Sequence, residues 1–576
     1  MPTWSTRAFL FALALAFAGC PSSDDDDATA NDDDVVDDDD AIDDDDAVDD
    51  DDAVDDDDST ADPLDRQTWV DPPEIEVDGD GVLQLRMEVA EVQIGDRRLC
   101  LRTWNGAVPG PTIDIAAASS PRQVRLDFTN TLTTEDLQTV GPPGPGAPEY
   151  DFNETNLHTH GLHVRPDEDA TGTYLADNVL AHHAAGATAQ YRFDIDEDEA
   201  ERGRPHEPGT FWYHPHVHGT TGIQVANGMA GALIVRGDID SVAGIAEATE
   251  RIFVMTHIPT GATALGAGET CDESSLSVND FAIIAAPPEE VQVNGVIQPR
   301  IVVPPGQVER WRLIHAGVTQ EMNVGLYAGT DDDCSGVTGA PIEVSQISVD
   351  GITFHAAQAR EKVFLSSGNR ADLMVEAPAT DGVYCLAYEQ PAAPGQPPST
   401  IVIAVLDVDS AAGTPTGGFP SDSDLDASAL PLLDCNAAAD GAQDLIFSQQ
   451  VHSVTGDDCD GVPPGGGLGF NINCEEFDHM NPRVLTVNRT EDWTATSEFG
   501  DHPFHIHVNP FMVCEGTIDG ETVTPHWRDT VMVGESVDLR LRMVYETYTG
   551  SFVTHCHKLH HEDQGMMEMI RIDPEL

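Results

Sequence analysis

The feature that most constrains the fold is a short run near the C-terminal end in which a cysteine stands between two histidines. Residues 554–569 read Thr-His-Cys-His-Lys-Leu-His-His-Glu-Asp-Gln-Gly-Met-Met-Glu-Met. Within twelve residues this run offers a thiol, three imidazoles and a thioether, on Cys556, His555, His557, His561 and Met566. These are side chains that bind copper in proteins. The run therefore predicts a copper site.

The geometry of a β-strand gives this run two functions. If residues 551–557 are extended, successive side chains point to opposite faces. Cys556 then faces one side, and His555 and His557 face the other at a spacing of about 6 to 7 Å. On the cysteine side, His561, Met566 and one further histidine complete the His2Cys site with a weak axial methionine that suits electron-transfer copper. One strand thus serves two metal sites.

The pattern His-x-His recurs three more times in apolar, strand-like surroundings. A single such pair is more often two ordinary strand histidines, but four pairs with a cysteine inside one of them favour copper. The three further pairs are His158 with His160, His214 with His216, and His505 with His507. With His555 and His557 they make eight imidazoles, enough for two coppers with three histidines each and one with two.

His502 is left over from this count and stands in the run His502-Pro503-Phe504-His505. Because proline disrupts strand alternation, the His502 side chain can turn away from the face of His505 and towards Cys556. It is the predicted second histidine of the cysteine site.

The four segments resemble the copper-binding motifs of the multicopper oxidases, the family of laccases, cuprous oxidases and ferroxidases. Order and spacing agree over nearly all of the chain after residue 65, and no ligand position is missing. The resemblance implies four copper ions: a type 1 copper on His502, Cys556, His561 and Met566, a type 2 copper on His158 and His505, and a type 3 pair on His160, His214, His216, His507, His555 and His557.

The resemblance also implies a reaction, in which four one-electron oxidations of a reductant are coupled to the reduction of dioxygen to two waters. This reduction consumes four protons. Glu562 directly follows His561, where related bacterial oxidases carry an acidic residue proposed to donate protons. Asp177 resembles the acid after the first histidine motif that would orient the water of the type 2 copper. The alternative for both is an ordinary surface or turn carboxylate.

The reductant stays open between two classes. Laccase-like oxidation of phenols or other organic reductants is favoured, because the Met-rich insertion typical of cuprous oxidases is absent and residues 376–477 contain no methionine. A metallo-oxidase acting on Cu(I), Fe(II) or Mn(II) is the alternative. A copper-binding protein without turnover is less favoured, since every ligand position is filled. Nothing in the sequence resembles a nucleic-acid surface, and we expect a monomer.

Residues 1–20 resemble the signal peptide of a bacterial lipoprotein. Arg7 precedes an apolar run from Ala8 to Ala18 that is too short to span a bilayer, and Phe17-Ala18-Gly19-Cys20 resembles a cleavage site that leaves Cys20 lipidated. The alternative is an ordinary signal peptide. We expect an exported protein, in the periplasm or on the outer membrane or cell surface of a bacterium, with only this lipid anchor in the membrane.

An acidic linker is predicted at residues 21–62. Its core, residues 24–58, contains 23 Asp and no basic residue, so it repels itself and has no apolar mass to bury. It is predicted to be a disordered tether, with a sponge for divalent cations as the alternative. The rest of the chain keeps −53 of the formal charge of −76, and an acidic surface attracts cations.

The remaining chain is predicted to be all-β. Short alternating runs such as residues 123–128 and 371–375 lie between Gly, Pro and Asp turns, with few convincing helices. This pattern and the resemblance predict three cupredoxin-like Greek-key β-sandwich domains, at residues 63–240, 245–409 and 427–576. The copper motifs fall in the first and third domains, so the three-copper cluster should lie between them and the second domain should be largely a spacer.

Cysteine usage indicates an oxidising compartment, since eight cysteines besides Cys20 and Cys556 allow up to four disulfides. Cys459 with Cys474 is the predicted local pair. Among the other histidines, His163 and His218 adjoin the first two motifs and could support the ligands. Surface or loop positions are expected for His182, His183, His206, His257, His315, His355, His452, His479, His526 and His560.

Overall fold

A computed structural model describes residues 68–117, 122–139, 149–260, 264–285, 290–390, 399–451, 468–475 and 477–575. The predicted signal peptide and the acidic linker lie outside these described residues. Within them strands dominate and the helices are short, so the predicted all-β fold is confirmed. Within the same ranges, the search for a helix with the length and apolar character of a membrane span finds none.

The first lobe, residues 83–235, has two four-stranded sheets in the orders β2-β1-β4-β8 and β3-β10-β9-β7, and β5 pairs with β6. Its strands are β1 (Leu83–Ile94), β2 (Arg97–Trp104), β3 (Gly110–Ile115), β4 (Gln123–Asn130), β5 (Leu137–Thr139), β6 (Glu149–Asp151), β7 (His158–His160), β8 (Thr188–Asp194), β9 (Gly209–His214) and β10 (Gly231–Val235), and its helices are α1 (Glu199–Arg202) and α2 (Thr221–Ala226).

The middle lobe, residues 249–408, has a sheet in the order β13-β12-β11-β15-β21-β18-β19 and a second in the order β14-β23-β22-β16-β17, with β20 beside β16. Its elements are β11 (Thr249–Thr256), α4 (Phe281–Ile284), β12 (Gln292–Val293), β13 (Val296–Ile297), β14 (Arg300–Val303), β15 (Val308–His315), β16 (Met322–Gly329), β17 (Val337–Ile342), β18 (Val344–Val349), β19 (Ile352–Arg360), β20 (Val363–Leu365), β21 (Arg370–Glu376), β22 (Gly382–Gln390) and β23 (Ser399–Val408).

The third lobe, residues 441–573, follows helix α5 (Asp422–Ser428) and has sheets in the orders β25-β24-β27-β34-β29-β32 and β26-β36-β35-β28-β33, with β30 beside β31. Its elements are β24 (Gly441–Val451), β25 (Leu468–Ile472), β26 (Arg483–Thr486), β27 (Thr490–Ser497), β28 (His502–Ile506), β29 (Phe511–Glu515), β30 (Thr517–Ile518), β31 (Glu521–Thr522), β32 (His526–Arg528), β33 (Thr530–Val533), β34 (Leu539–Val544), β35 (Gly550–Cys556), α6 (Leu559–Glu562) and β36 (Met567–Asp573).

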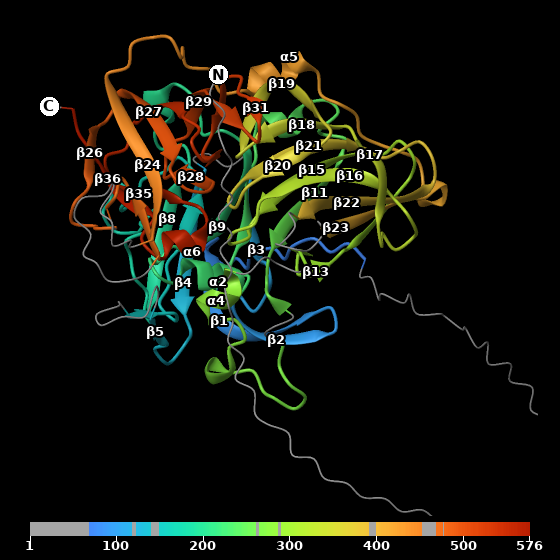
Figure 1. Cartoon of the computed structure of the whole chain (residues 1–576), viewed down its shortest axis with the longest axis horizontal. Helices are drawn as coiled ribbons and strands as arrows, with labels where there is room; N and C mark the ends of the chain where they lie inside the picture. Colours follow the sequence, from blue (N-terminus) through green and yellow to red (C-terminus); the bar gives the residue numbers. More distant parts are fainter. Residues whose placement is uncertain are drawn as a thin grey trace, which may run out of the picture. The chain divides into compact units, whose positions relative to one another are not determined.

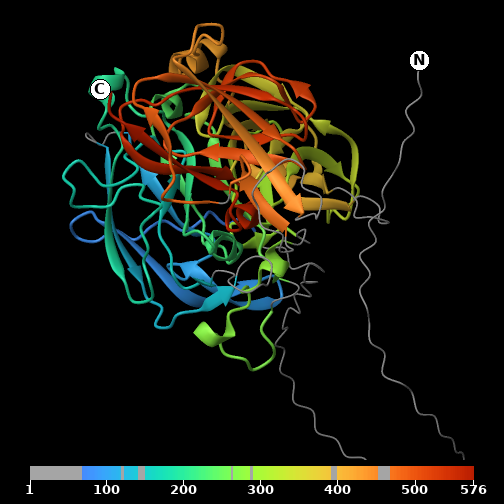
Figure 2. The same cartoon turned by 60° about the vertical axis from the view of Figure 1, so that its left-hand side comes forward.

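Each large sheet draws its strands from one lobe, and Figure 1 shows the yellow-green strands of the middle lobe and the orange-red strands of the third as separate groups. In Figure 2 the orange and red strands lie next to the blue and cyan strands of the first lobe. The lobes fall within the domain ranges predicted above, whose exact limits stay predictions.

Side-chain alternation explains why the strands of each lobe form two-layered cores. In β4 the side chains of Val124, Leu126 and Phe128 are buried in the first lobe's core, while Arg125 between them is exposed. Strand β35 differs, because every residue from Phe552 to Cys556 is buried. A strand buried on both faces has no solvent side, and here the second face lies against the first lobe, where His216 contacts His555.

Three disulfides join described residues: Cys100 with Cys271, Cys334 with Cys385, and Cys435 with Cys514. The predicted pair of Cys459 and Cys474 includes Cys459, which lies outside the described residues, so that pairing stays a prediction. Cys556 is a free, buried thiol.

Candidate metal centre

Strand β35 carries the cysteine between its two flanking histidines into the centre of the third lobe. It pairs with β28, with Phe504 opposite Cys556 and His505 opposite His555. Because facing residues of antiparallel strands point to the same side of the sheet, His505 and His555 share one face and Phe504 and Cys556 share the other. The alternation predicted from the sequence therefore separates one sulfur from two imidazoles.

The sulfur belongs to a three-residue cluster that consists of His502, Cys556 and His561. The Cys556 Sγ lies 3.4 Å from the Nδ1 of His502 and 3.7 Å from the Nδ1 of His561, and these two nitrogens are 3.2 Å apart. Met566 is buried in the same core as Cys556, and its backbone carbonyl accepts a hydrogen bond of 3.0 Å from the Cys556 N–H. The structure thus brings together all four predicted residues of this site.

Burial controls the ionisation of this cluster. Burial raises the pKa of the Cys556 thiol to about 12, although the charge of Lys558 and the Lys558 N–H that donates to Sγ act in the opposite direction. Burial also lowers the pKa of His502 to about 4. Before metal binds, the site therefore holds a neutral thiol and neutral imidazoles at pH 7.

Aromatic rings cover the two histidines of this cluster. Phe470 stacks on the ring of His561 with a centroid distance of 4.1 Å, and Phe447 stacks on His502 at 5.3 Å. The His561 residue retains partial solvent exposure. It is thus the least buried of the three residues in this cluster.

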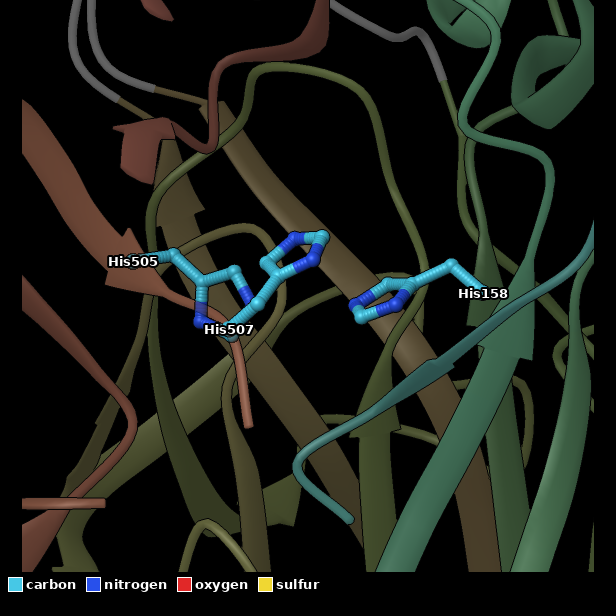
Figure 3. A group of neighbouring side chains, drawn as sticks. All are labelled: His158, His505 and His507. Carbon is cyan, nitrogen blue, oxygen red and sulfur yellow. The ribbon is translucent and has the colours of Figure 1, made fainter. Parts of the chain in front are cut away.

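The eight remaining predicted histidines form a second cluster between the first and third lobes. His158 stacks on His507 and His160 stacks on His505, each with a centroid distance of 3.9 Å. Figure 3 shows His158 facing His505 and His507 from a different chain segment. All eight histidines are buried, at 2% exposure or less: His158, His160, His214, His216, His505, His507, His555 and His557.

Ring nitrogens of these histidines converge within metal-binding distance. The Nε2 atoms of His216 and His555 are 3.1 Å apart, and ligand nitrogens of His216, His507 and His555 all lie within 4.8 Å of one another. The Nε2 of His557 lies 3.2 Å from the Nδ1 of His160. Imidazole nitrogens that bind one metal at about 2.0 to 2.1 Å necessarily lie this close together.

The hydrogen bonding of the cluster fits metal ligands. Among the described residues, no hydrogen-bond partner is found for the Nε2 atoms of His158, His214 and His505 or for either ring nitrogen of His507. A buried polar atom without a partner costs about 1 to 3 kcal/mol. Burial also lowers the pKa of His214 to about 3 and that of His216 to about 4, so the rings are neutral and have free lone pairs at pH 7. Neutral imidazole is the form that binds copper.

Asp177 lies against the cluster's first histidine. Its Oδ2 is 2.9 Å from the Nδ1 of His158, and its Oδ1 accepts hydrogen bonds from the Thr159 backbone N–H and hydroxyl. Burial raises the pKa of Asp177 to about 7, although the bonds from Thr159 lower it. The carboxylate therefore fixes the His158 ring with Nε2 directed to the cluster.

Glu562 is buried beside two other histidines. Its oxygens lie 3.1 Å from the Nδ1 of His555 and 3.4 Å from the Nδ1 of His216. Burial acts to raise the pKa of Glu562, but the adjacent imidazoles outweigh it and lower the pKa. Burial and the Glu562 carboxylate raise the pKa of neighbouring Asp563, whose oxygens accept N–H bonds from Gly219, Thr221 and Gly222.

His452 lies outside the described residues. Of the other histidines, three are informative about their predictions. His163 contacts the backbone oxygen of Val508 at 2.6 Å and Asp198 at 3.1 Å. His218 packs against the rings of Tyr150 and Phe477. The expected surface or loop position is wrong for His315, because it ends the fully buried strand β15.

The middle lobe also contacts the histidine cluster, so the prediction that it is largely a spacer is wrong. Its Ser367 Oγ lies 3.2 Å from the Nδ1 of His557, and its Arg370 donates to Asp529, which lies 3.3 Å from His160. No sequence motif marked Ser367, Arg370 or Asp529. Each acts on a histidine more than a hundred residues away, and an isolated polar residue beside a strand gives no signal of such a contact.

Comparisons with known proteins agree with this geometry. Family models described as multicopper oxidase match residues 152–239 and 449–575. A laccase from Haloferax volcanii is 25% identical over 506 residues, which cover 81% of this chain and 76% of the relative. Each matched range contains two of the four copper motifs.

Solved structures are similar over most of the chain. A multicopper oxidase from Campylobacter jejuni, described as a metallo-oxidase, has a TM-score of 0.64 at 21% identity and covers 88% of this chain and 96% of its own. A laccase-like multi-copper oxidase from Ochrobactrum sp., described as active towards lignin model compounds, has a TM-score of 0.62 at 18% identity, covering 88% and 100%. These matches confirm the cupredoxin-like fold.

Proposed function

Because this chain belongs to the multicopper oxidase family and is an oxidoreductase with oxygen as acceptor, we propose that it couples four one-electron oxidations of an organic reductant to the reduction of dioxygen to water. One observation carries this proposal. In strand β35 the sulfur of Cys556 lies in the three-residue cluster, while the adjacent His555 and His557 lie in the eight-histidine cluster. The peptide bonds beside Cys556 join the two clusters directly.

The family implies copper, and the geometry supports four ions. His502, Cys556, His561 and Met566 would hold a type 1 ion, and His158 and His505 a type 2 ion. The type 3 pair would be held by His216, His507 and His555 and by His160, His214 and His557. When bound, copper supplies the one-electron redox chemistry that links oxidation of the reductant to reduction of dioxygen.

The chain's own side chains prepare this site. Asp177 orients the ring of His158, and complete burial of the histidines excludes bulk water from the cluster. Glu562 contacts His216 and His555, so it stands where a proton must be delivered during dioxygen reduction. We assign Glu562 as a proton-transferring residue, whose carboxylate must first take up each proton that it passes on, and Asp177 as the residue that positions the type 2 ligand.

An organic reductant is supported by the aromatic surroundings of the sulfur cluster. Phe470 stacks on His561, and the largely exposed Phe499 lies beside His502, whose Nε2 is 2.9 Å from the Phe499 backbone oxygen. Aromatic side chains favour stacking with flat organic rings. The alternative reductant is a metal ion, Cu(I), Fe(II) or Mn(II), which is favoured by the formal charge of −53 outside the acidic run.

Oxygen uptake tests these proposals. The copper-loaded protein is supplied with a phenol, Cu(I) or Fe(II) in parallel, with Cys556→Ser as a control that lacks the sulfur ligand. We expect uptake with the phenol, at four molecules oxidised per dioxygen, and none with the control. Faster uptake with a metal ion would favour the alternative, and no uptake with any reductant would contradict the oxidase function.

We further propose that the protein is exported and anchored through a lipid on Cys20. This rests on residues 1–20 of the sequence, which lie outside the described residues. Substituting Cys20→Ser should move the protein from the membrane fraction to the soluble fraction. An unchanged distribution would contradict the anchor.

A further inference from the structure

Arg370 is a fully buried arginine in the middle lobe, which contributes none of the proposed copper ligands. Its guanidinium contacts all three lobes. Nε donates to the Thr210 carbonyl of the first lobe at 3.1 Å, and Nη1 donates to the Gly368 carbonyl of its own lobe at 3.0 Å. Nη1 and Nη2 donate to the two oxygens of Asp529 in the third lobe at 2.8 and 2.6 Å.

Asp529, the partner of Arg370, also contacts two histidines of the cluster. Its Oδ1 lies 3.3 Å from the Nε2 of His160, and its backbone carbonyl accepts a hydrogen bond of 2.8 Å from the Nδ1 of His505. The opposite nitrogens of both rings then face the cluster. The Nδ1 of His160 lies 3.2 Å from His557, and the Nε2 of His505 has no hydrogen-bond partner within the described part of the chain.

The loop before Arg370 touches a third histidine. A Cβ added to Gly368 would lie 3.0 Å from the ring atoms of His557, and the Ser367 Oγ lies 3.2 Å from the Nδ1 of the same ring. Asn369 fixes this loop to the third lobe by donating to the Thr530 carbonyl at 2.9 Å. The middle lobe therefore forms one wall of the histidine cluster.

Packing leaves the Arg370 and Asp529 pair little room to shift. Gly161 follows His160 with a φ of +91°, and a Cβ at this position would collide with both the Arg370 guanidinium and the Asp529 carboxylate. A bidentate arginine and carboxylate pair also has a fixed relative orientation. Small displacements of the middle lobe are thus transmitted to His160 and His505.

We propose that Arg370 and Asp529 are positioning residues for the copper cluster, and that the histidines bind copper tightly only when the middle lobe is docked through this pair. The inference rests on the copper assignment above. It goes beyond that assignment because it gives the middle lobe control over a cluster whose ligands all lie in the other two lobes.

Arg312 provides a matched control for a purely structural role. It lies in the same lobe, on β15, and is also fully buried. It forms ion pairs with Asp372 and Glu250 and bonds the hydroxyl of Thr210. Within the described part of the chain, its hydrogen-bond and ion-pair partners include no histidine. Removing its charge therefore weakens a buried ion-pair network, in which Asp372 keeps Arg310 as a partner, without touching the cluster.

The test compares Arg370→Gln, Asp529→Asn and Arg312→Gln after copper loading and dialysis, with copper content and blue absorption as readouts. Loss of a group that supports a metal ligand typically weakens metal binding about 10- to 100-fold. We therefore expect the first two variants to lose the cluster copper and keep the blue absorption of the cysteine site. Arg312→Gln should keep both. Arg370→Lys should restore part of the cluster copper.

Two results would overturn the proposal. Retention of cluster copper in the Arg370 and Asp529 variants would show that the pair does not position the ligands, and equal loss of both signals in all three variants would show that it only stabilises the fold. If the copper assignment itself is wrong, the unmodified protein will bind no copper at the histidine cluster. That result is distinguishable from the two above, which are seen only in the variants.

Discussion

The Nδ1 of His158 lies 2.9 Å from the Oδ2 of Asp177, and both residues are buried at 1% exposure. A carboxylate on one ring nitrogen fixes the tautomer and orientation of an imidazole that binds metal through the other. Substituting Asp177→Asn should therefore weaken copper binding at the type 2 site by about 10- to 100-fold. Copper retention under dialysis and the electron paramagnetic resonance signal of the type 2 ion measure this effect.

Asp169 serves as the control for this variant. It is a buried acid of the same lobe that accepts bonds from Thr171, Thr173 and Tyr174. Its substitution by Asn should leave the type 2 signal unchanged. If Asp177→Asn also retains the signal, the proposed role in positioning His158 is wrong.

Glu562→Gln should slow oxygen consumption while leaving the blue absorption intact. The amide keeps the shape of the side chain next to His216 and His555, but it cannot donate a proton. General acid catalysis contributes roughly 10²- to 10⁴-fold, so we expect turnover to fall about 100-fold or more. Oxygen uptake at saturating reductant measures it.

Glu568→Gln is the comparison variant for Glu562. Glu568 lies on β36 and pairs with Arg483 at 3.0 Å, partly exposed to solvent. Equal rates in the two variants would show that Glu562 does not supply protons.

The copper-free protein should lose stability as the pH falls below 6.5. The pKa of His214 is lowered to about 3 and that of His216 to about 4, both mainly by burial. Between these values and the unfolded value near 6.5, the unfolded chain binds more protons, so unfolding becomes more favourable as pH falls. Each such histidine costs up to about 1.4 kcal/mol per pH unit in this window.

Buried carboxyls act with the opposite sign. Burial raises the pKa of Asp177 to about 7. The ionised carboxyl therefore destabilises the folded state above the unfolded pKa of Asp, and this cost is relieved as the pH falls through 7 because the folded protein takes up the proton first. The lowered histidines outnumber the raised carboxyls, so the net effect should be acid destabilisation. Urea unfolding of the copper-free protein at pH 7 and pH 5 measures this, and an equal or higher midpoint at pH 5 would contradict it.

Copper binding at the cysteine site should release about one proton at pH 7. Burial raises the pKa of the Cys556 thiol to about 12, and a thiol must lose its proton to bind metal. The histidines are already neutral and release none. Calorimetry of Cu(II) binding in buffers of different ionisation enthalpy gives the number of protons. Cys556→Ser should abolish this release, and release of several protons would show that the imidazoles start out charged.

The sequence predicted the copper ligands better than it predicted the residues that position those ligands. His-x-His at strand spacing and the proline after His502 are local patterns with direct geometric consequences, and the structure brings those side chains together. Arg370 and Asp529 are separated by 159 residues and meet only through the docking of the middle lobe on the third. No local periodicity encodes such a contact, and a spacer role for the middle lobe was the wrong prediction as a result.

The disposition of charge was also only partly predictable. The acidic composition predicts a negative surface charge. It does not predict the pKa shifts of the buried acids Asp177, Glu562 and Asp563, which differ because their neighbours differ. Glu562 and Asp563 are adjacent in sequence. Only the fold places one beside imidazoles and the other beside backbone N–H groups.

The contact between His160 and His557 spans 397 residues of chain. During synthesis, the histidines of the first lobe therefore cannot contact their partners until most of the polypeptide has been made. A ribosome-bound or prematurely terminated product that ends before β28 retains His158, His160, His214 and His216 but lacks the opposing rings and the thiol. Assembly of the complete copper cluster must therefore follow completion of the chain.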